Sequence, residues 1–240
     1  IIIICRSNSR RLPGKISKKI LGYTLLEILS LRLIRVFGRE NILICTSNKE
    51  KNNILKNIAK KLNVKIFFGK NFNIFKRLID ASKKYNINHI VRVTGDNPLT
   101  DPEILKKMIK FYSNNKIDFM YTNSLFPGLK SEIFSVKSLK KCNSLSQDPN
   151  SSEYLTYFFL RKKVFKLKCF KEKRISSKEK KLSITVNNKL DFMKLKKLLK
   201  KSKSSIYITR DEIIKNLKAK KNKVNNKKIP IKTKTYDARL

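Results

Sequence analysis

The stretch Ile1-Ile-Ile-Ile-Cys-Arg-Ser-Asn-Ser-Arg-Arg-Leu-Pro-Gly-Lys15 is a short β-branched run that opens directly into a polar, basic loop. Such a run is typical of a strand that is buried on both faces of a parallel sheet. Backbone amides at the carboxyl end of a strand, together with guanidinium, ammonium and hydroxyl groups, can hold phosphates. The stretch therefore predicts a phosphate-binding loop, and the alternative is a basic surface turn after an edge strand.

Strands and helices alternate along the chain that follows, which is the pattern of a mostly parallel sheet with helices on both faces. We expect strands at residues 1–5, 42–45, 64–68 and 90–93, and helices at 25–37, 52–62, 72–85 and from Pro102 onward, with Asp101 as its N-cap. Gly95 and Asp96 come just past the carboxyl end of strand 90–93, where open α/β sheets bind their ligands.

The pattern changes after Tyr112, where the expected elements are shorter and less regular. We expect strands at residues 119–121, 133–134, 164–169 and 182–186, and a lysine-rich helix at 190–199. A length of 240 residues suits one α/β domain, which we place at residues 1–217, with residues 112–189 as a distinct region inside it. The basic segment 218–240 is expected to be flexible.

The spacing R-x-x-S-x-R-L-P-G-K at residues 6–15 and the run V-R-V-T-G-D-N-P-L-T-D-P at residues 91–102 carry a family resemblance. The chain resembles the cytidylyltransferases that activate acidic sugars, and in particular the spore-coat polysaccharide subgroup, over residues 1–217. The resemblance implies a Rossmann-like nucleotide-diphospho-sugar transferase fold. It also implies that a sugar hydroxyl attacks the α-phosphorus of CTP, which releases pyrophosphate and leaves a CMP-sugar for surface polysaccharide synthesis.

The resemblance implies roles for single residues as well. The phosphate loop would bind the nucleotide, with Lys15 and Arg6 as catalytic cations, and a carboxylate would hold Mg²⁺ together with the substrate phosphates. The implied nucleotide-binding residues are Arg6, Ser9, Arg11, Lys15, Arg77 and Arg92; the metal ligands are Asp96 and, more weakly, Asn187; and Glu132 would bind the sugar.

Several positions depart from the family pattern by exchanging a carboxylate or another polar group. Asn187 stands where the family usually has an aspartate, and a neutral amide attracts a dication less strongly than a carboxylate does. The other departures are Ile4, Asn52, Asn53, Asn73, Lys130 and Tyr154. They leave open a second hypothesis, that the chain is a catalytically weakened relative that binds nucleotide or a partner enzyme.

The net charge of +41 suggests a third hypothesis, a nucleic-acid-binding protein. Lysine far outnumbers arginine, however, and the excess of Lys, Asn and Ile is also what codon drift in an A- and T-rich genome produces. No aromatic-interleaved basic motif accompanies the charge, so we expect only nonspecific, salt-sensitive association with nucleic acid.

Other features bear on location and partners. No apolar run approaches the roughly 20 residues of a membrane span, and residues 1–5 lack the features of a signal peptide, so we expect no membrane association and no export. The four cysteines show no C-x-x-C spacing, which predicts reduced thiols in a cytoplasmic protein. The resemblance also allows a homodimer, and it leaves the identity of the sugar open.

Overall fold

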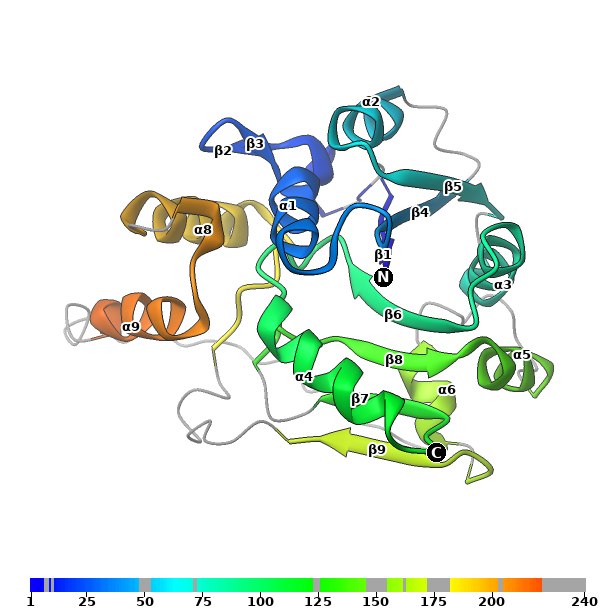
Figure 1. Ribbon diagram of the computed structural model, residues 1–240. Helices are drawn as coiled ribbons and strands as arrows, with labels where there is room; N and C mark the ends of the chain where they lie inside the picture. Colours follow the sequence, from blue (N-terminus) through cyan, green and yellow to red (C-terminus); the bar gives the residue numbers. More distant parts are fainter. Residues whose placement is uncertain are drawn as a thin grey trace.

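The computed structural model describes residues 1–6, 9, 11–47, 53–70, 73–122, 126–145, 155–161, 163–171, 182–202 and 205–221. One sheet contains the strands β1 (Ile2–Ile4), β4 (Leu43–Ser47), β5 (Lys65–Gly69), β6 (His89–Thr94), β7 (Phe119–Thr122), β8 (Glu132–Ser135) and β9 (Leu167–Phe170). Their order is β5-β4-β1-β6-β8-β7-β9, and only the pairs that involve β8 are antiparallel (Figure 1). The expected α/β class with a mostly parallel sheet is confirmed.

Strand β1 lies in the middle of the parallel part of the sheet. Ile3 pairs with Ile44 on β4 and with Val93 on β6. Successive side chains of a strand point to opposite faces, and accordingly Ile2 and Ile3 belong to two different hydrophobic clusters, both almost fully buried. This two-sided burial explains why the run of isoleucines has no polar alternation.

Helices cover both faces of the sheet (Figure 1). One face packs against α1 (Leu25–Phe37), α2 (Asn53–Leu62) and α4 (Pro102–Ser113), and the other against α3 (Ile74–Lys84), α5 (Val136–Ser144) and α6 (Leu155–Arg161). Two further helices, α8 (Lys189–Lys201) and α9 (Arg210–Lys221), lie beside α1 and α4, at the left of Figure 1.

Polar side chains fix the starts of two of these helices. The Thr24 hydroxyl accepts a hydrogen bond from the Glu27 backbone N–H, and the Glu27 carboxylate accepts one from Thr24, which is a capping box at the start of α1. At α4 the Asp101 carboxylate accepts from two backbone N–H groups, and Pro102 follows at the first helical position. The expected start of α4 is confirmed.

Two sequence-based expectations differ from the structure. Residues 182–186 form no strand, because their backbone bonds to two loops instead of a ladder: the Ile184 N–H donates to Pro127 and the Val186 N–H to Asp96. The domain boundary expected after residue 217 stays a prediction: α9 runs to Lys221, and residues 222–240 lie outside the described chain. The hairpin of β2 (Lys19–Ile20) and β3 (Tyr23–Thr24), with strands of only two residues, was not expected.

Candidate active site at the carboxyl edge of the sheet

A close contact between two loops brings the phosphate loop and Asp96 together. The Gly95 N–H donates to the carbonyl of Ile4, the last residue of β1. A Cβ atom at Gly95 would lie 2.7 Å from the Cβ atom of Cys5, which is closer than real side chains approach. Glycine at position 95 therefore lets the loop after β6 pack against the loop after β1, and the next residue, Asp96, stands beside the phosphate loop.

Lys15 is the buried cation of this site, with 8% of its surface exposed. It opens the short 3₁₀ helix η1 (Lys15–Ser17), directly after Gly14, whose φ of 61° is in the left-handed region. The Nζ atom donates to the Val186 carbonyl at 2.9 Å and lies 4.0 Å from Asp96 Oδ2. The structure thus places Lys15 between the loop after β6 and the segment that precedes α8.

The other cations of the phosphate loop lie close enough to Lys15 to act on it. Burial lowers the pKa of Lys15 below its usual value, Arg11 and Arg6 act in the same direction, and Asp96 and Asp191 oppose them. Arg6 and Arg11 are exposed, and Ser9 is half-buried. The structure therefore gathers three positive side chains at this loop, as a site for a polyanionic ligand requires.

Asp96 has one oxygen available for a ligand. Its Oδ1 atom is buried and has no hydrogen-bond partner, although buried polar atoms are nearly always paired. Within the described chain no three His, Cys, Asp or Glu residues cluster in a way that could hold a metal. A Mg²⁺ ion at Asp96 would therefore take most of its ligands from substrate phosphates, which is common for this ion.

Asn187 lies next to Asp96, because the backbone N–H of its neighbour Val186 donates to the Asp96 carbonyl at 2.8 Å. The N–H groups of Asn187 and Asn188 both donate to the carboxylate of Asp191, which also completes a capping box at the start of α8. Asp191 is thus a second acid near Lys15 that our sequence analysis missed. Its signal was the N-x-x-D spacing of Asn188 and Asp191.

Arg92 and Glu132 face each other across β6 and β8 and form an ion pair. Arg92 Nη1 lies 2.5 Å from Glu132 Oε2, and 12% and 13% of the two side chains are exposed. Thr156 donates to the other carboxylate oxygen. Both predicted site residues are therefore already engaged with each other, and their contacts with nucleotide and sugar stay predictions.

Arg77 lies on α3 and is almost fully buried, with 4% exposed. Its Nε atom donates to the Lys70 carbonyl at 3.0 Å, and its side chain passes over Gly69, where a Cβ atom would collide with it. This contact fixes the turn after β5. A role in nucleotide binding stays a prediction.

The remaining departures from the family pattern have local explanations or lie outside the described residues. Asn73 caps α3 by accepting from the Lys76 N–H at 2.8 Å. Asn53 opens α2, and the Lys130 side chain is exposed. Ile4 is half-buried as the last residue of β1, whereas Asn52 and Tyr154 are outside the described residues.

Unpaired buried polar atoms concentrate at this edge. Of nine such side-chain atoms in the described residues, five belong to residues near the carboxyl ends of the parallel strands or at the start of β8: Thr46, Asp96, Asn97, Thr122 and Ser131. Water or a ligand normally completes such atoms. The carboxyl edge is thus the part of the sheet best prepared for a polar ligand.

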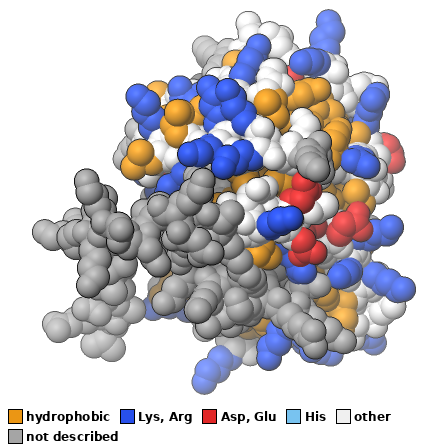
Figure 2. Space-filling model, turned by 90° about the vertical axis from the view of Figure 1, so that its left-hand side faces the viewer, with side chains coloured by type: hydrophobic (Ala, Val, Ile, Leu, Met, Phe, Trp, Pro, Cys, Tyr) orange, Lys and Arg blue, Asp and Glu red, His pale blue; other side chains and the backbone are white. Residues whose placement is uncertain are grey.

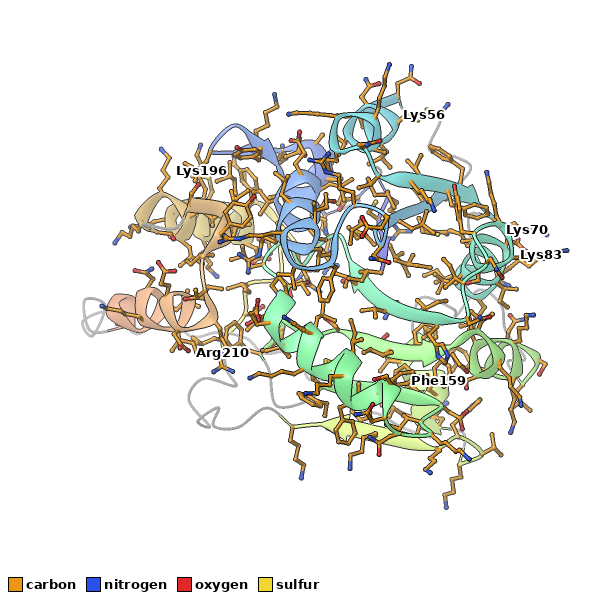
Figure 3. The ribbon with its side chains drawn as sticks, in the orientation of Figure 1. Lys56, Lys70, Lys83, Phe159, Lys196 and Arg210 are labelled. Atoms are coloured by element: carbon orange, nitrogen blue, oxygen red, sulfur yellow. The ribbon has the colours of Figure 1, made fainter. Side chains whose placement is uncertain are left out.

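Positive charge is spread widely beyond the site. Figure 2 shows basic side chains over much of one face of the molecule, with several acidic side chains close together among them. In Figure 3 the labelled lysines lie on three sides of the molecule: Lys56 at the top, Lys196 at the left, and Lys70 and Lys83 together at the right. This even spread fits nonspecific association with polyanions, which stays a prediction. No helix in the described chain has the length and apolar character needed to cross a membrane.

Comparisons with known proteins agree with this arrangement. A family model described as cytidylyltransferase matches residues 1–229. The spore coat polysaccharide biosynthesis protein SpsF of Bacillus subtilis is 26% identical over 218 residues, which cover 89% of this chain and 91% of that protein. The 3-deoxy-manno-octulosonate cytidylyltransferase of Rickettsia bellii is 29% identical over 125 residues, or 50% of each chain.

The solved structures include a cytidylyltransferase from Leptospira borgpetersenii serovar Hardjo-bovis with a TM-score of 0.85. It is 29% identical, and the superposition covers 95% of this chain and 97% of that one. The family model, SpsF and the Leptospira structure each match nearly the whole length of the chain. This chain therefore belongs to the cytidylyltransferase family.

Proposed function

We propose that this protein transfers CMP from CTP to an acidic sugar and supplies the CMP-sugar for surface polysaccharide synthesis. The observation that carries the proposal is the cationic phosphate loop packed against Asp96 at the carboxyl edge of the sheet. The name of the Rickettsia relative supports the nucleotide and the class of sugar, and the name of SpsF supports the polysaccharide product. The four free cysteines support a cytoplasmic location, where thiols stay reduced.

The reaction needs little covalent chemistry from the protein. The oxygen of the sugar hydroxyl bonds to the α-phosphorus and its proton passes to water, while the bond from that phosphorus to the bridging oxygen breaks and pyrophosphate leaves. Lys15 is held by the Val186 carbonyl, so its positive charge is already positioned before the substrate arrives. Arg6 and Arg11 add exposed positive charge at the rim of the site. Such preorganised charge stabilises the negative charge that moves onto the leaving group.

The residues present fit Mg²⁺, since Asp96 offers a buried, unpartnered carboxylate oxygen and the neighbouring Asn187 offers an amide oxygen. The ion, when bound, would neutralise phosphate charge. The protein itself would contribute one negatively charged ligand, Asp96, and one neutral ligand, Asn187. We therefore expect weak binding of Mg²⁺ alone and much stronger binding of Mg²⁺ together with CTP.

The proposal is tested by pyrophosphate release from CTP, UTP, ATP and GTP with Mg²⁺ and a panel of acidic sugars. We expect release with CTP, and a loss of kcat/KM of about 100-fold or more in Lys15→Ala, because a positioned charge is removed. Lys19→Ala, at an exposed lysine of the β2 strand, is the matched control. Failure of every sugar, or an equal loss in the two variants, would contradict the proposal.

The neutral Asn187 beside Asp96 favours one alternative, a catalytically weakened relative that binds nucleotide or a partner enzyme. Asn187→Asp separates the two. If the natural chain transfers CMP slowly, and the variant transfers it faster and binds Mg²⁺ more tightly, the alternative gains support. Full turnover by the natural chain removes it.

A further inference from the structure

A cavity of about 390 Å³ lies away from the candidate active site, among the second half of α1, the first turn of α4 and the segment that leads from η3 (Ser205–Tyr207) into α9. None of the residues predicted to bind CTP, Mg²⁺ or sugar lines it. Its size is that of a site for a small molecule. Its lining includes four cations and an aromatic ring: Arg32, Arg35, Lys107, Arg210 and Tyr207.

Arg32 is the buried cation in this wall, with 4% exposed. Its Nη1 atom donates to the carbonyls of Ile206 at 2.7 Å and Ile208 at 2.9 Å. Its Nε atom is buried and has no hydrogen-bond partner, and no carboxylate in the described chain lies within ion-pair distance of the guanidinium. Burial lowers the pKa of Arg32 to about 10, so the group is still charged at neutral pH.

Three acids also line the cavity, Asp101, Glu103 and Asp211, but none of them lies within ion-pair distance of the Arg32 guanidinium. Asp101 lies near enough to raise the pKa of Arg32, but its Oδ1 atom accepts from the N–H groups of Glu103 and Ile104 at the start of α4. Asp211 Oδ1 lies 3.6 Å from Arg210 Nε. Asp101 thus opposes the charge of Arg32 only from beyond ion-pair distance, and a buried charge without a close counterion is costly to hold. A bound anion in the adjoining cavity would remove that cost.

The same part of the cavity lining is suited to the body of an organic ligand. The Arg35 guanidinium stacks on the Tyr207 ring, with its carbon 4.7 Å from the ring centre. This stacking holds a ring and a cation side by side at the cavity. Figure 3 shows Arg210 at the start of α9, beside α4, where it borders the same space.

We propose that this cavity binds a small organic anion, a carboxylate or a phosphate ester, with its charged group toward Arg32 and Arg35 and its body against Tyr207. The site is separate from the phosphate loop. The proposal therefore stands or fails independently of the CMP transfer proposed above.

The test uses the absence of tryptophan from this chain. Tyr207→Trp places a single fluorescent reporter in the cavity wall, and Tyr157→Trp, at an exposed tyrosine on α6, reports nonspecific association of anions. Inorganic phosphate, CMP and glucuronate are titrated in about 0.15 M salt, with Lys15→Ala added to both reporters to weaken binding at the phosphate loop. We expect a saturable change in the Tyr207→Trp protein and none in the control.

Arg32→Met and Arg35→Met in the reporter protein should each weaken the binding of the anion by at least tenfold. Because Arg32 also binds the carbonyls of Ile206 and Ile208, circular dichroism is used to check that the Arg32→Met variant is folded. If that variant unfolds, the affinity of Arg35→Met alone decides the test. Saturation by glucuronate identifies a carboxylate site, and saturation by CMP and inorganic phosphate identifies a phosphate site. No saturation by any probe, equal changes in both reporters, or unchanged affinity in the deciding variant would overturn the proposal.

Discussion

Removing one partner of the ion pair between Arg92 and Glu132 should cost several kcal/mol of stability, because both side chains are nearly buried and the remaining charge would be left unpaired. Among the described residues, Arg92→Met leaves the Glu132 carboxylate with only the Thr156 hydroxyl as a hydrogen-bond partner. Two unit charges about 4 Å apart at an effective dielectric constant of 20 attract by about 4 kcal/mol. Removing one partner of a buried pair costs about 3–5 kcal/mol. We therefore expect a loss of about 3 kcal/mol, or roughly 6–12 °C in Tm for a chain of this length.

The pair between Lys76 and Asp80 is the matched control. Its N–O distance of 2.7 Å is similar, but 47% and 31% of the two side chains are exposed. Exposed pairs four residues apart on a helix contribute about 0.3–0.5 kcal/mol. Lys76→Met should therefore cost less than about 0.5 kcal/mol in urea unfolding followed by circular dichroism.

A double-mutant cycle separates the pair from the other effects of each change. Arg92→Met combined with Glu132→Gln should cost about 2 kcal/mol less than the sum of the single variants, because neither charge is left unpaired. Equal losses for Arg92→Met and Lys76→Met would refute the reasoning, since burial would then not govern the strength of the pair.

Two further predictions concern the loops and α1. Gly95→Ala should lose about 1–3 kcal/mol in thermal unfolding, because the new methyl group meets Cys5, and an unchanged Tm would show that the loops separate easily. Burial raises the pKa of Glu27, but hydrogen bonds from Lys61 and Thr24 outweigh it and hold the pKa below the usual 4.5. The stabilisation that comes from this lowered pKa is complete above pH 4.5 and is lost as the pH falls through the pKa of the folded state. Glu27→Gln should therefore flatten the fall in Tm between neutral pH and about pH 3. Parallel curves of Tm against pH for the natural chain and the variant would contradict this.

The arrangement of the parallel strands could be predicted because its signals are local. The apolar run of residues 1–5 indicates a buried strand by its composition alone. The start of α4 is indicated by a capping residue, Asp101, followed by Pro102. The position of Asp96 just past β6 followed from the rule that parallel strands end at a shared edge. A strand at residues 133–134 was expected, but the antiparallel direction of β8 and its pairing of Glu132 with Arg92 could not be predicted, because register between distant strands has no local signal.

The segment 182–186 shows the limit of periodicity. Its apolar alternation fits a strand, yet Ile184 and Val186 find backbone partners in two loops that only the complete fold places there. The cavity beside Arg32 was missed for the same reason. It exists because the segment of Ile206 and Ile208 docks on α1, and that contact spans 174 and 176 residues of sequence.

The hydrogen bond from Lys15 to Val186 joins residues 171 positions apart. A chain growing from its N-terminus completes the phosphate loop and the four neighbouring parallel strands long before Val186 is made. Until then Lys15 lacks the carbonyl that holds it, and contacts of such separation form late because closing a long loop is slow. Binding of a nucleotide at the completed site would therefore show that synthesis has passed residue 186. Nucleotide binding to the growing chain could then be used to measure when this part of the fold forms.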